Sequence, residues 1–452
     1  MAKADRDAVL RARKRVPPPG GALLEDTEKM KQKHHRMLCA FCALVILVST
    51  VFPTAAFAEQ PVDAAATEQT LTRADAAGMQ QADAAVTALT ESEQYQEMDT
   101  DARKDAALAQ LDTLAARGLV EKDSIYTDEE NGMVSFRYPC GVLGGILLTE
   151  PEDETLDEEN AETETASNAL SLRLPPDLGA EMQTSRAALL RRTENQAVEK
   201  FGTAVIYYAF DNTINSSRFP YYSYMQGFWS ALGLETKINI HVTVADLKKM
   251  GNYNVSVLSA HGSYYTYSYG KFLKRTRTEP IMLLTEESTF GKDLRYGFDL
   301  LAHRVIKVNG MYCVTSDFFR NAYKGGKLSN TIVYSETCEF LGVDGSEDNA
   351  MADALLSGGA QAVIGYVNNV YTVYSRSMLW DTINHLIMGQ NVGQALEHAK
   401  ATYGEDDLIW YHAQGGRRPH AAASYAVLYG NSQAALHVPE SNRSMFSADL
   451  AA

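Results

Sequence analysis

Two short apolar runs of the sequence each end in a residue that can take part in nucleophilic chemistry. Residues 255–260 (VSVLSA) lead directly into His261, and residues 331–335 (TIVYS) are followed, three positions later, by Cys338. An imidazole titrates near neutral pH, so it can accept the proton of a thiol and later protonate a departing amine. The residue types therefore suit attack by a thiolate on a carbonyl carbon, provided that the fold brings the two side chains together.

The sequence around these residues predicts an α/β fold. From Gly202 onward, short apolar runs typical of buried strands alternate with helical stretches. The predicted strands are Thr203–Phe210, Ile238–Val244, Val255–Ala260, Thr331–Ser335, Ala362–Val367 and Ala426–Tyr429. The predicted helices are Tyr224–Leu232, Asp246–Met250, Phe318–Lys324, Asn349–Leu356, Ser375–Met388 and Val392–Tyr403. This alternation predicts a mostly parallel sheet flanked by helices, and ligand chemistry in such sheets lies beyond the carboxyl ends of the strands.

The neighbours of the two residues suggest how a substrate would be handled. Gly262 would let the backbone approach a substrate carbonyl, so we expect the backbone N–H groups of Gly262 and Cys338 to form an oxyanion hole. Glu336 precedes Cys338 by two positions and should therefore point to the same side of its strand.

These motifs resemble the caspase-like (clan CD) cysteine peptidases, which include gingipains, clostripain, legumain, separase and the CHAT-domain proteases. Those families place His-Gly after one apolar strand and Cys after the next parallel one. Residues 351–400 look like the helix-strand-helix-helix that follows the nucleophile in gingipain and CHAT domains, and residues 425–430 look like the closing gingipain strand. The resemblance covers about residues 201–437. It implies that His261 is the general acid/base and Cys338 the nucleophile of an endopeptidase that needs no cofactor and no metal.

The chain also departs from the family pattern. His261 and Cys338 are 77 residues apart, against about 50 in caspases, and the caspase Gln-Ala-Cys signature is absent. Thr337 stands where Ala usually precedes the nucleophile. The surplus length is predicted to hold inserted strands at Ile281–Thr285 and Arg304–Thr315, the latter turning at Asn309-Gly310.

The resemblance also bears on specificity. In legumain and clostripain an acidic residue at the position of Glu336 lines the pocket for the residue before the scissile bond, which implies cleavage after Arg or Lys. The alternative is that Glu336 orients His261 or packs at the end of the sheet. Val367, Asn368 and Asn369 end the next predicted strand, and we expect them to form another wall of that pocket.

Composition excludes several other classes. The chain is 45% hydrophobic and 22% charged, with a formal net charge of -16. Residues after Arg36 carry a net charge of -21, so a nucleic-acid partner is excluded and a protein or peptide substrate is expected. The five cysteines predict no structural zinc site, because the Cys-x-x-Cys pair that they contain, Cys39 and Cys42, lies in the uncharged stretch near the start of the chain. Cys313 is expected to pack inside its strand, with pairing to Cys140 as the alternative. Surface positions are expected for His303, His385, His398, His412 and His420.

The start of the chain resembles an export signal. Basic residues precede the uncharged stretch Met37–Ala58, which ends in Ala56-Phe57-Ala58. Cleavage after Ala58 would make the protein secreted or cell-surface in a bacterial-type cell, and an uncleaved single-span anchor is the alternative. We divide the chain into a signal peptide with a long n-region (1–58), a helical segment with a small α+β hairpin unit (59–148), an acidic linker with a connecting helix (149–200), the catalytic domain (201–437) and a tail (438–452).

Two further expectations concern regulation and the competing function. The linker carries nine acidic residues over Glu150–Glu164, so it is expected to act as a solvated tether that screens the substrate channel of a zymogen. Residues suited to self-cleavage are Arg173, Arg186, Arg191 and Arg192. The alternative function is a catalytically inactive caspase-like surface binding module, with Tyr264, Tyr265, Tyr267 and Tyr269 as its contact patch.

Overall fold

A computed structural model of the chain describes residues 70–148, 198–210, 221–270, 273–408 and 423–446. The predicted leader 1–58, the linker through Ala197, and His412 and His420 lie outside these residues. None of the described helices is both long and apolar enough to cross a membrane.

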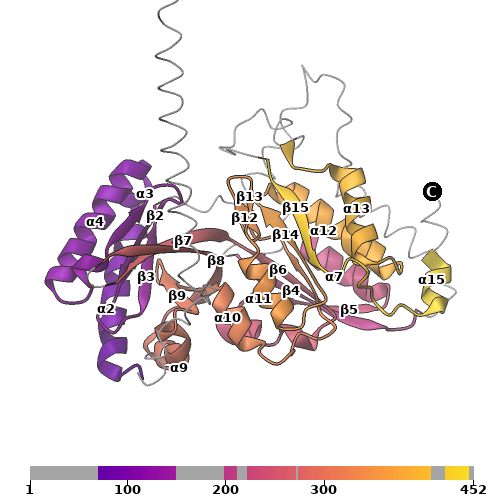
Figure 1. The fold of residues 1–452 in the computed structure, drawn as a ribbon, viewed down its shortest axis with the longest axis horizontal. Helices are drawn as coiled ribbons and strands as arrows, with labels where there is room; N and C mark the ends of the chain where they lie inside the picture. The colour runs from indigo at the N-terminus through magenta and orange to yellow at the C-terminus, as the bar shows by residue number, and fades with distance from the viewer. Residues whose placement is uncertain (1–69, 149–197, 211–220, 271–272, 409–422, 447–452) are drawn as a thin grey trace, which may run out of the picture. The chain divides into compact units, whose positions relative to one another are not determined.

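A six-stranded sheet forms the half of the fold that carries His261 and Cys338 (Figure 1). Its strand order is β15-β14-β11-β6-β4-β5, and every pairing is parallel except that of β14 with β15. The strands are β4 (Gly202–Ala209), β5 (Leu234–Asn239), β6 (Val255–Ala260), β11 (Ile332–Ser335), β14 (Ala362–Val367) and β15 (Tyr425–Gly430). The predicted α/β class and the largely parallel sheet are confirmed.

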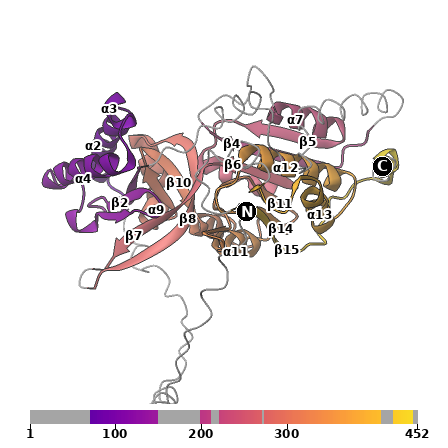
Figure 2. The same cartoon turned by 90° about the horizontal axis from the view of Figure 1, so that it is seen from above.

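Helices pack on both faces of this sheet (Figures 1 and 2). One face packs against α7 (Tyr221–Ala231), α12 (Thr372–Ile387) and α13 (Val392–Tyr403), and we call it the α12 face. The other face packs against α10 (Ser316–Ala322) and α11 (Ala350–Ser357). Successive residues of each strand alternate between the faces, so both sides of the sheet are apolar, as the continuous hydrophobic runs predicted.

The strand predicted over Ile238–Val244 is misplaced. β5 ends at Asn239, and a short helix, α8 (Val244–Leu247), follows it. β5 is an edge strand in which Glu235 and Lys237 are exposed. Its alternating polar residues hid it from a search for strands buried on both faces.

The predicted inserts and the N-terminal strands build a second, seven-stranded sheet of order β1-β2-β3-β9-β10-β8-β7. Its strands are β1 (Tyr126–Asp128), β2 (Met133–Arg137), β3 (Leu143–Leu147), β7 (Gly262–Tyr269), β8 (Arg275–Glu287), β9 (Val305–Val308) and β10 (Met311–Thr315). The hairpins predicted at Asn131-Gly132 and Asn309-Gly310 form, and β3 pairs with β9 in parallel. β7, which begins directly after His261, was not predicted.

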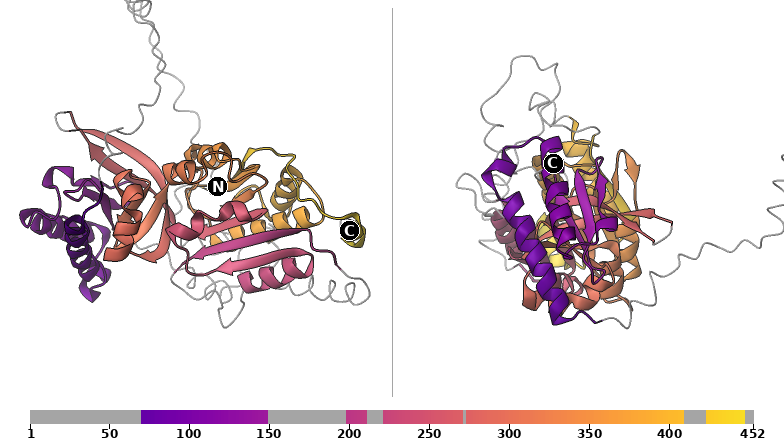
Figure 3. Two further views of the ribbon diagram at one scale, coloured as in Figure 1. Left: turned by 90° about the horizontal axis from the view of Figure 1, so that it is seen from below. Right: turned by 90° about the vertical axis from the view of Figure 1, so that its left-hand side faces the viewer.

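The Ala-, Asp-, Gln- and Thr-rich composition of residues 59–92 predicts a frayed helix or tail, and this prediction is wrong from Arg73 onward. α2 (Arg73–Thr90) begins with a capping box at Thr72, and it buries Ala76, Met79, Ala82 and Val86. Small alanine side chains let this helix pack closely beside α4 (Thr100–Ala116), as Figure 3 shows. Alanine-rich composition had suggested a lack of core-forming residues.

A buried ion cluster ties α2 to the second sheet. Lys307 on β9 is fully buried, and its Nζ lies 2.5 Å from Asp83 on α2 and 2.9 Å from Asp293. Asp293 belongs to α9 (Phe290–Leu301). Removing one member would leave buried charge without compensation, so the cluster fixes which segments pack together.

The remaining described elements are short, apart from a C-terminal helix. They are α3 (Glu93–Gln96), two 3₁₀ turns (Lys122–Ser124 and Met250–Asn252), and the paired strands β12 (Gly342–Val343) and β13 (Ser346–Glu347). The predicted tail contains α15 (Glu440–Phe446), whose Asn442 side chain binds the backbone N–H and carbonyl of Glu199 at 3.1 and 2.7 Å.

Candidate active site

The carboxyl ends of β6 and β11 lie side by side. The two strands pair in parallel, with Ser335 opposite Leu258, and the N–H of Glu336 donates to the carbonyl of Leu258 at 2.8 Å. His261 lies three residues after Leu258, and Cys338 lies three residues after its partner Ser335. The structure thus brings the two predicted catalytic residues to one edge of the sheet.

Both residues also belong to the same face of the sheet. The His261 ring packs edge-on against Phe210, with ring centroids 4.6 Å apart, and Phe210 belongs to the hydrophobic cluster of the α12 face. Cys338 is half-buried and packs against that same cluster. The period-two alternation of strands accounts for this, since Tyr334, two residues before Glu336 and four before Cys338, also lies in the cluster.

Gly262 is required by the approach of the two strand ends. A Cβ atom at this position would lie 2.0 Å from the carbonyl oxygen of Cys338 and 2.5 Å from Cγ2 of Thr337. Gly262 also begins β7, where it pairs with Met282 of β8. The lack of a side chain at Gly262 therefore allows close packing against the backbone of Cys338, a contact that sequence analysis did not predict. The predicted oxyanion role of its N–H stays a prediction.

The Cys338 sulfur lies against the backbone of Val370, in the loop between β14 and α12. The N–H of Val370 donates to Sγ at 3.4 Å, and the Val370 carbonyl is 3.9 Å from Sγ. A backbone N–H aimed at sulfur stabilises negative charge on it. Sequence analysis missed Val370, because its contribution comes from the backbone and its side-chain type carries no signal.

Glu336 occupies the base of this site. It is 6% exposed, and its Oε2 accepts a hydrogen bond from Tyr222 of α7 at 3.0 Å. The Tyr222 oxygen in turn lies 3.0 Å from Ser259 Oγ and accepts from Nε of Arg376 at 3.3 Å. The Arg376 guanidinium lies over the rings of Tyr221 and Tyr222. A buried, connected polar network therefore holds the carboxylate on the predicted side of the strand.

The three residues predicted as a further pocket wall lie in different environments. Val367 is fully buried, in the hydrophobic cluster on the face opposite Cys338. Asn368 uses its side chain within the protein, accepting from the N–H of Gly345 at 2.9 Å and donating to the carbonyl of Ala423 at 2.8 Å. Asn369 is exposed and directly precedes Val370. Asn369 is thus the member that solvent reaches.

Glu339, directly after Cys338, adds a titratable group to the site. Burial, and to a smaller extent the neighbouring Asp344, raise the pKa of Glu339 to about 7. Its backbone has φ 54°, and its N–H donates to the carbonyl of Asn368 at 3.0 Å. The chain therefore turns sharply after the sulfur and is fastened to the end of β14.

A surface pocket of the described residues lies on the seven-stranded sheet. Side chains of β1, β7 and β8 line it, including Tyr126, Tyr264 and Thr278. Neither His261 nor Cys338 is among its lining residues. The two strand-end residues therefore lie outside that pocket.

The prediction that four tyrosines form an exposed contact patch for a binding module is wrong. Tyr264, Tyr265 and Tyr267 are at most 5% exposed, and Tyr269 alone is exposed, at 41%. These tyrosines belong to β7, and both faces of this strand are covered over Tyr264–Ser268. The hydroxyl of Tyr265, for example, donates to the carbonyl of Gly144 at 2.8 Å.

The expectations for the other cysteines and histidines are mixed. Cys313 is fully buried in β10, as predicted, and neither it nor Cys140 forms a disulfide. The surface position expected for His385 is wrong, because this residue is 8% exposed. Burial, and then the neighbouring His398, lower the pKa of His385 to about 4. His303 is half-buried, with Nε2 3.0 Å from the Gly141 carbonyl oxygen.

Comparison with known proteins leaves the family open. No protein-family model matches the chain, and a search of curated proteins found no match. The resemblance to caspase-like peptidases therefore rests on the motifs quoted above and on the strand-end geometry.

Replacing Gly262 by Ala tests the contact between the two strand ends. Because the new methyl group would meet the backbone of Cys338, we expect the free energy of unfolding to fall by about 1 to 3 kcal/mol. The rate of Cys338 alkylation, measured by peptide mass spectrometry, should also change. Gly227→Ala is the matched control, since nothing lies within 4 Å of its added Cβ on the exposed side of α7. Unchanged stability and unchanged alkylation in Gly262→Ala would show that the strand ends do not touch in this way.

Proposed function

We propose that this chain is an exported cysteine endopeptidase with a caspase-like fold, in which His261 is the general acid/base and Cys338 the nucleophile. The observation that carries the proposal is the pairing of β6 with β11, which delivers both residues to one edge and one face of a parallel sheet. The function expected from the sequence needs this juxtaposition. If the fold had placed His261 and Cys338 far apart, the proposed function would have had no structural support.

The chemistry follows from the residue types. His261 takes the proton of the Cys338 thiol, and the sulfur attacks the carbonyl carbon of the scissile peptide. The negative charge that develops on the carbonyl oxygen is stabilised by the N–H groups of Gly262 and Cys338. His261 then gives its proton to the leaving amine as the C–N bond breaks. Water, deprotonated by the same imidazole, hydrolyses the thioester and restores the thiol.

The backbone of Val370 assists by holding the nucleophile. Its N–H donates to Sγ at 3.4 Å, so the backbone orients the sulfur. Preorganised donors of this kind contribute most where charge forms or moves during the reaction.

Cleavage after a basic residue is the proposed specificity. The Glu336 carboxylate lies on the same face of the sheet as the sulfur, two residues before it, and Tyr222 holds it in place. An arginine or lysine side chain entering from the Cys338 side would form a charge-assisted hydrogen bond with this group. Asn369, which is exposed beside the Val370 loop, is the proposed contact on the opposite wall.

Export and synthesis as a zymogen complete the proposal. Both rest on segments outside the described residues, namely the leader 1–58, the acidic stretch 150–164 and the arginines that follow it. Cleavage after one of these arginines would release the tether if the pocket prefers Arg. A Cys338→Ala protein that is processed like the wild type would exclude self-cleavage.

Labelling by a thiol-directed peptidyl probe tests the enzymatic function. We expect the purified protein, before or after limited proteolysis, to be labelled at Cys338 and to hydrolyse peptide substrates. Both properties should be lost in Cys338→Ala and His261→Ala, because each variant removes one partner of the proton transfer. Cys140→Ala is the matched control and should retain both. A protein that folds but reacts with no probe after proteolytic activation would instead favour the binding module.

Fluorogenic peptides ending in Arg, Lys, Asp or Asn test the pocket. We expect the highest kcat/KM for Arg or Lys, and a loss of about 30-fold for these substrates in Glu336→Gln, corresponding to about 2 kcal/mol of lost charge pairing. The exposed Glu347→Gln serves as the control and should change little. A preference for Asp, or a Glu336→Gln enzyme with unchanged selectivity, would overturn the pocket assignment while leaving the dyad intact.

A further inference from the structure

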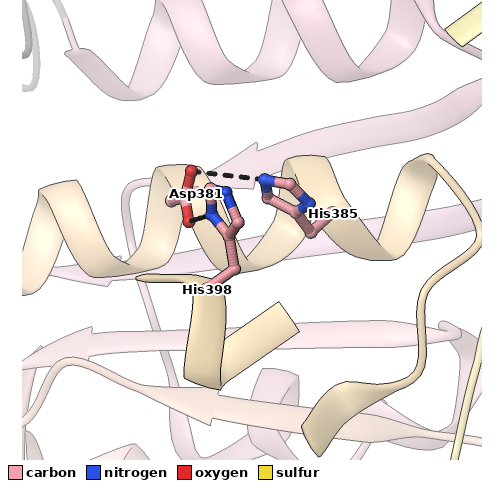
Figure 4. Close-up of side chains that lie close together, drawn as sticks. All are labelled: Asp381, His385 and His398. Atoms are coloured by element: carbon pink, nitrogen blue, oxygen red, sulfur yellow. Dashed lines mark hydrogen bonds and ion pairs between the residues drawn. The ribbon is translucent and has the colours of Figure 1, made fainter. Parts of the chain in front are cut away.

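A cluster of metal-ligating side chains lies between α12 and α13, away from the strand ends. Asp381 and His385 extend from α12, and His398 extends from α13 (Figure 4). Nδ1 of His398 is 2.7 Å from Oδ2 of Asp381, and Nε2 of His385 is 3.6 Å from Oδ1 of the same carboxylate. One ligand atom from each residue can be chosen so that all lie within 4.8 Å of one another.

The helical spacing explains how the cluster forms. Asp381 and His385 are four residues apart, so they lie on the same face of α12 in successive turns. The same spacing on one helix places two ligands on a single zinc ion in metalloproteases. The third ligand comes from α13, which packs against α12 in one hydrophobic cluster. Two rigid helices, not a loop, therefore hold the three side chains.

The separations are in the range that one small ion can bridge. With bonds of about 2.0 to 2.1 Å to nitrogen and oxygen, neighbouring ligand atoms of a tetrahedral site lie about 3.4 Å apart. His398 Nδ1 is 2.7 Å from Oδ2 of Asp381 and His385 Nε2 is 3.6 Å from Oδ1, so each imidazole faces its own oxygen of the carboxylate. The three ligand atoms, which lie within 4.8 Å of one another, would have to adjust to share one ion. Two imidazoles and one carboxylate form a donor set typical of zinc sites with an open fourth position.

A second observation points to a ligand at this place. His385 is 8% exposed, and its Nδ1 has no hydrogen-bond partner among the described residues. The buried Oε1 of Gln390 is likewise unpartnered within the described part of the chain, and the Gln390 backbone N–H donates to the His385 carbonyl at 3.0 Å. Metal-binding histidines usually donate their second ring N–H to such an oxygen. The Gln390 side chain lies beside the His385 ring and is placed to fill this role while Nε2 faces the ion.

The two imidazole rings also lie close together. The ring centroids of His385 and His398 are 3.7 Å apart, with both rings directed at one carboxylate. The His398 side chain is 47% exposed, so an ion can enter from solvent.

We propose that Asp381, His385 and His398 bind one zinc ion, which joins α12 to α13. Asp381 lies nine residues after Thr372, or roughly 14 Å along the helix from its first turn. The ion therefore lies apart from Cys338, but it fixes the helix whose preceding loop holds the sulfur through Val370. Sequence analysis predicted no metal, because the ligands belong to two helices and form no close His/Cys motif. The proposal is independent of the proteolytic function.

Zinc titration of the full chain, monitored by competition with a chromophoric chelator, tests this site. The Cys338→Ala background removes binding to the proposed dyad. We expect His398→Ala in that background to lose one equivalent of zinc, or to bind it at least tenfold more weakly. The exposed His241→Ala is the matched control and should bind like the parent. Cobalt should give a visible absorption spectrum of tetrahedral type in the parent and lose it in His398→Ala.

A measurement of thermal stability distinguishes a loss of zinc binding from a loss of folding. His398 is half-exposed, so its alanine variant should keep the circular dichroism of the parent. Zinc should raise the Tm of the parent and of His241→Ala by several degrees, and leave that of His398→Ala unchanged. Equal zinc stoichiometry and affinity in the parent and in His398→Ala would overturn the proposal. An equal Tm shift in both proteins would overturn it as well.

Discussion

The parallel pairing of β6 with β11 is the constraint on which the candidate site depends. Because the two strands are adjacent and in register, the residues that follow them lie at one sheet edge. The alternation of side chains then assigns His261 and Cys338 to the same face. Gly262 lets the two strand ends approach, since any larger residue would meet the Cys338 carbonyl. Backbone hydrogen bonding thus sets the position of both reactive side chains.

Buried hydrogen bonds also position the polar groups beneath this edge. Glu336, Tyr222 and Arg376 form a buried network that links β11 with α7 and α12. The Val370 loop adds a backbone contact to the sulfur from the third neighbouring strand, β14. Preorganised sites are built in this way, with each functional group supported by packed elements on several sides. The proposed zinc site would brace α12 in the same manner, further along the helix.

Much of this arrangement could be predicted from residues 201–437, because parallel strands buried on both faces stand out as uninterrupted apolar runs. β6, β14 and α13 have the predicted bounds. Predictions failed where the surroundings of a residue, and not its type, determine the structure and contacts that it adopts. β5 is an edge strand with polar alternation, and α2 packs through alanines. Three of the four tyrosines of β7 are buried, and Val370 contacts the sulfur through its backbone. The contacts among Asp381, His385 and His398 depend on how two helices pack, which no local pattern encodes.

The pH dependence of Cys338 alkylation tests the central claim, a proton exchanged between sulfur and imidazole, most directly. An ordinary thiol gains reactivity as it ionises near pH 8.5. Iodoacetamide modification of Cys338, followed by mass spectrometry, should reach half its maximal rate at a clearly lower pH in the wild type. In His261→Ala, the curve should move towards that of an ordinary thiol. Identical curves for the two proteins would contradict the account, because they would show that the imidazole does not act on the sulfur.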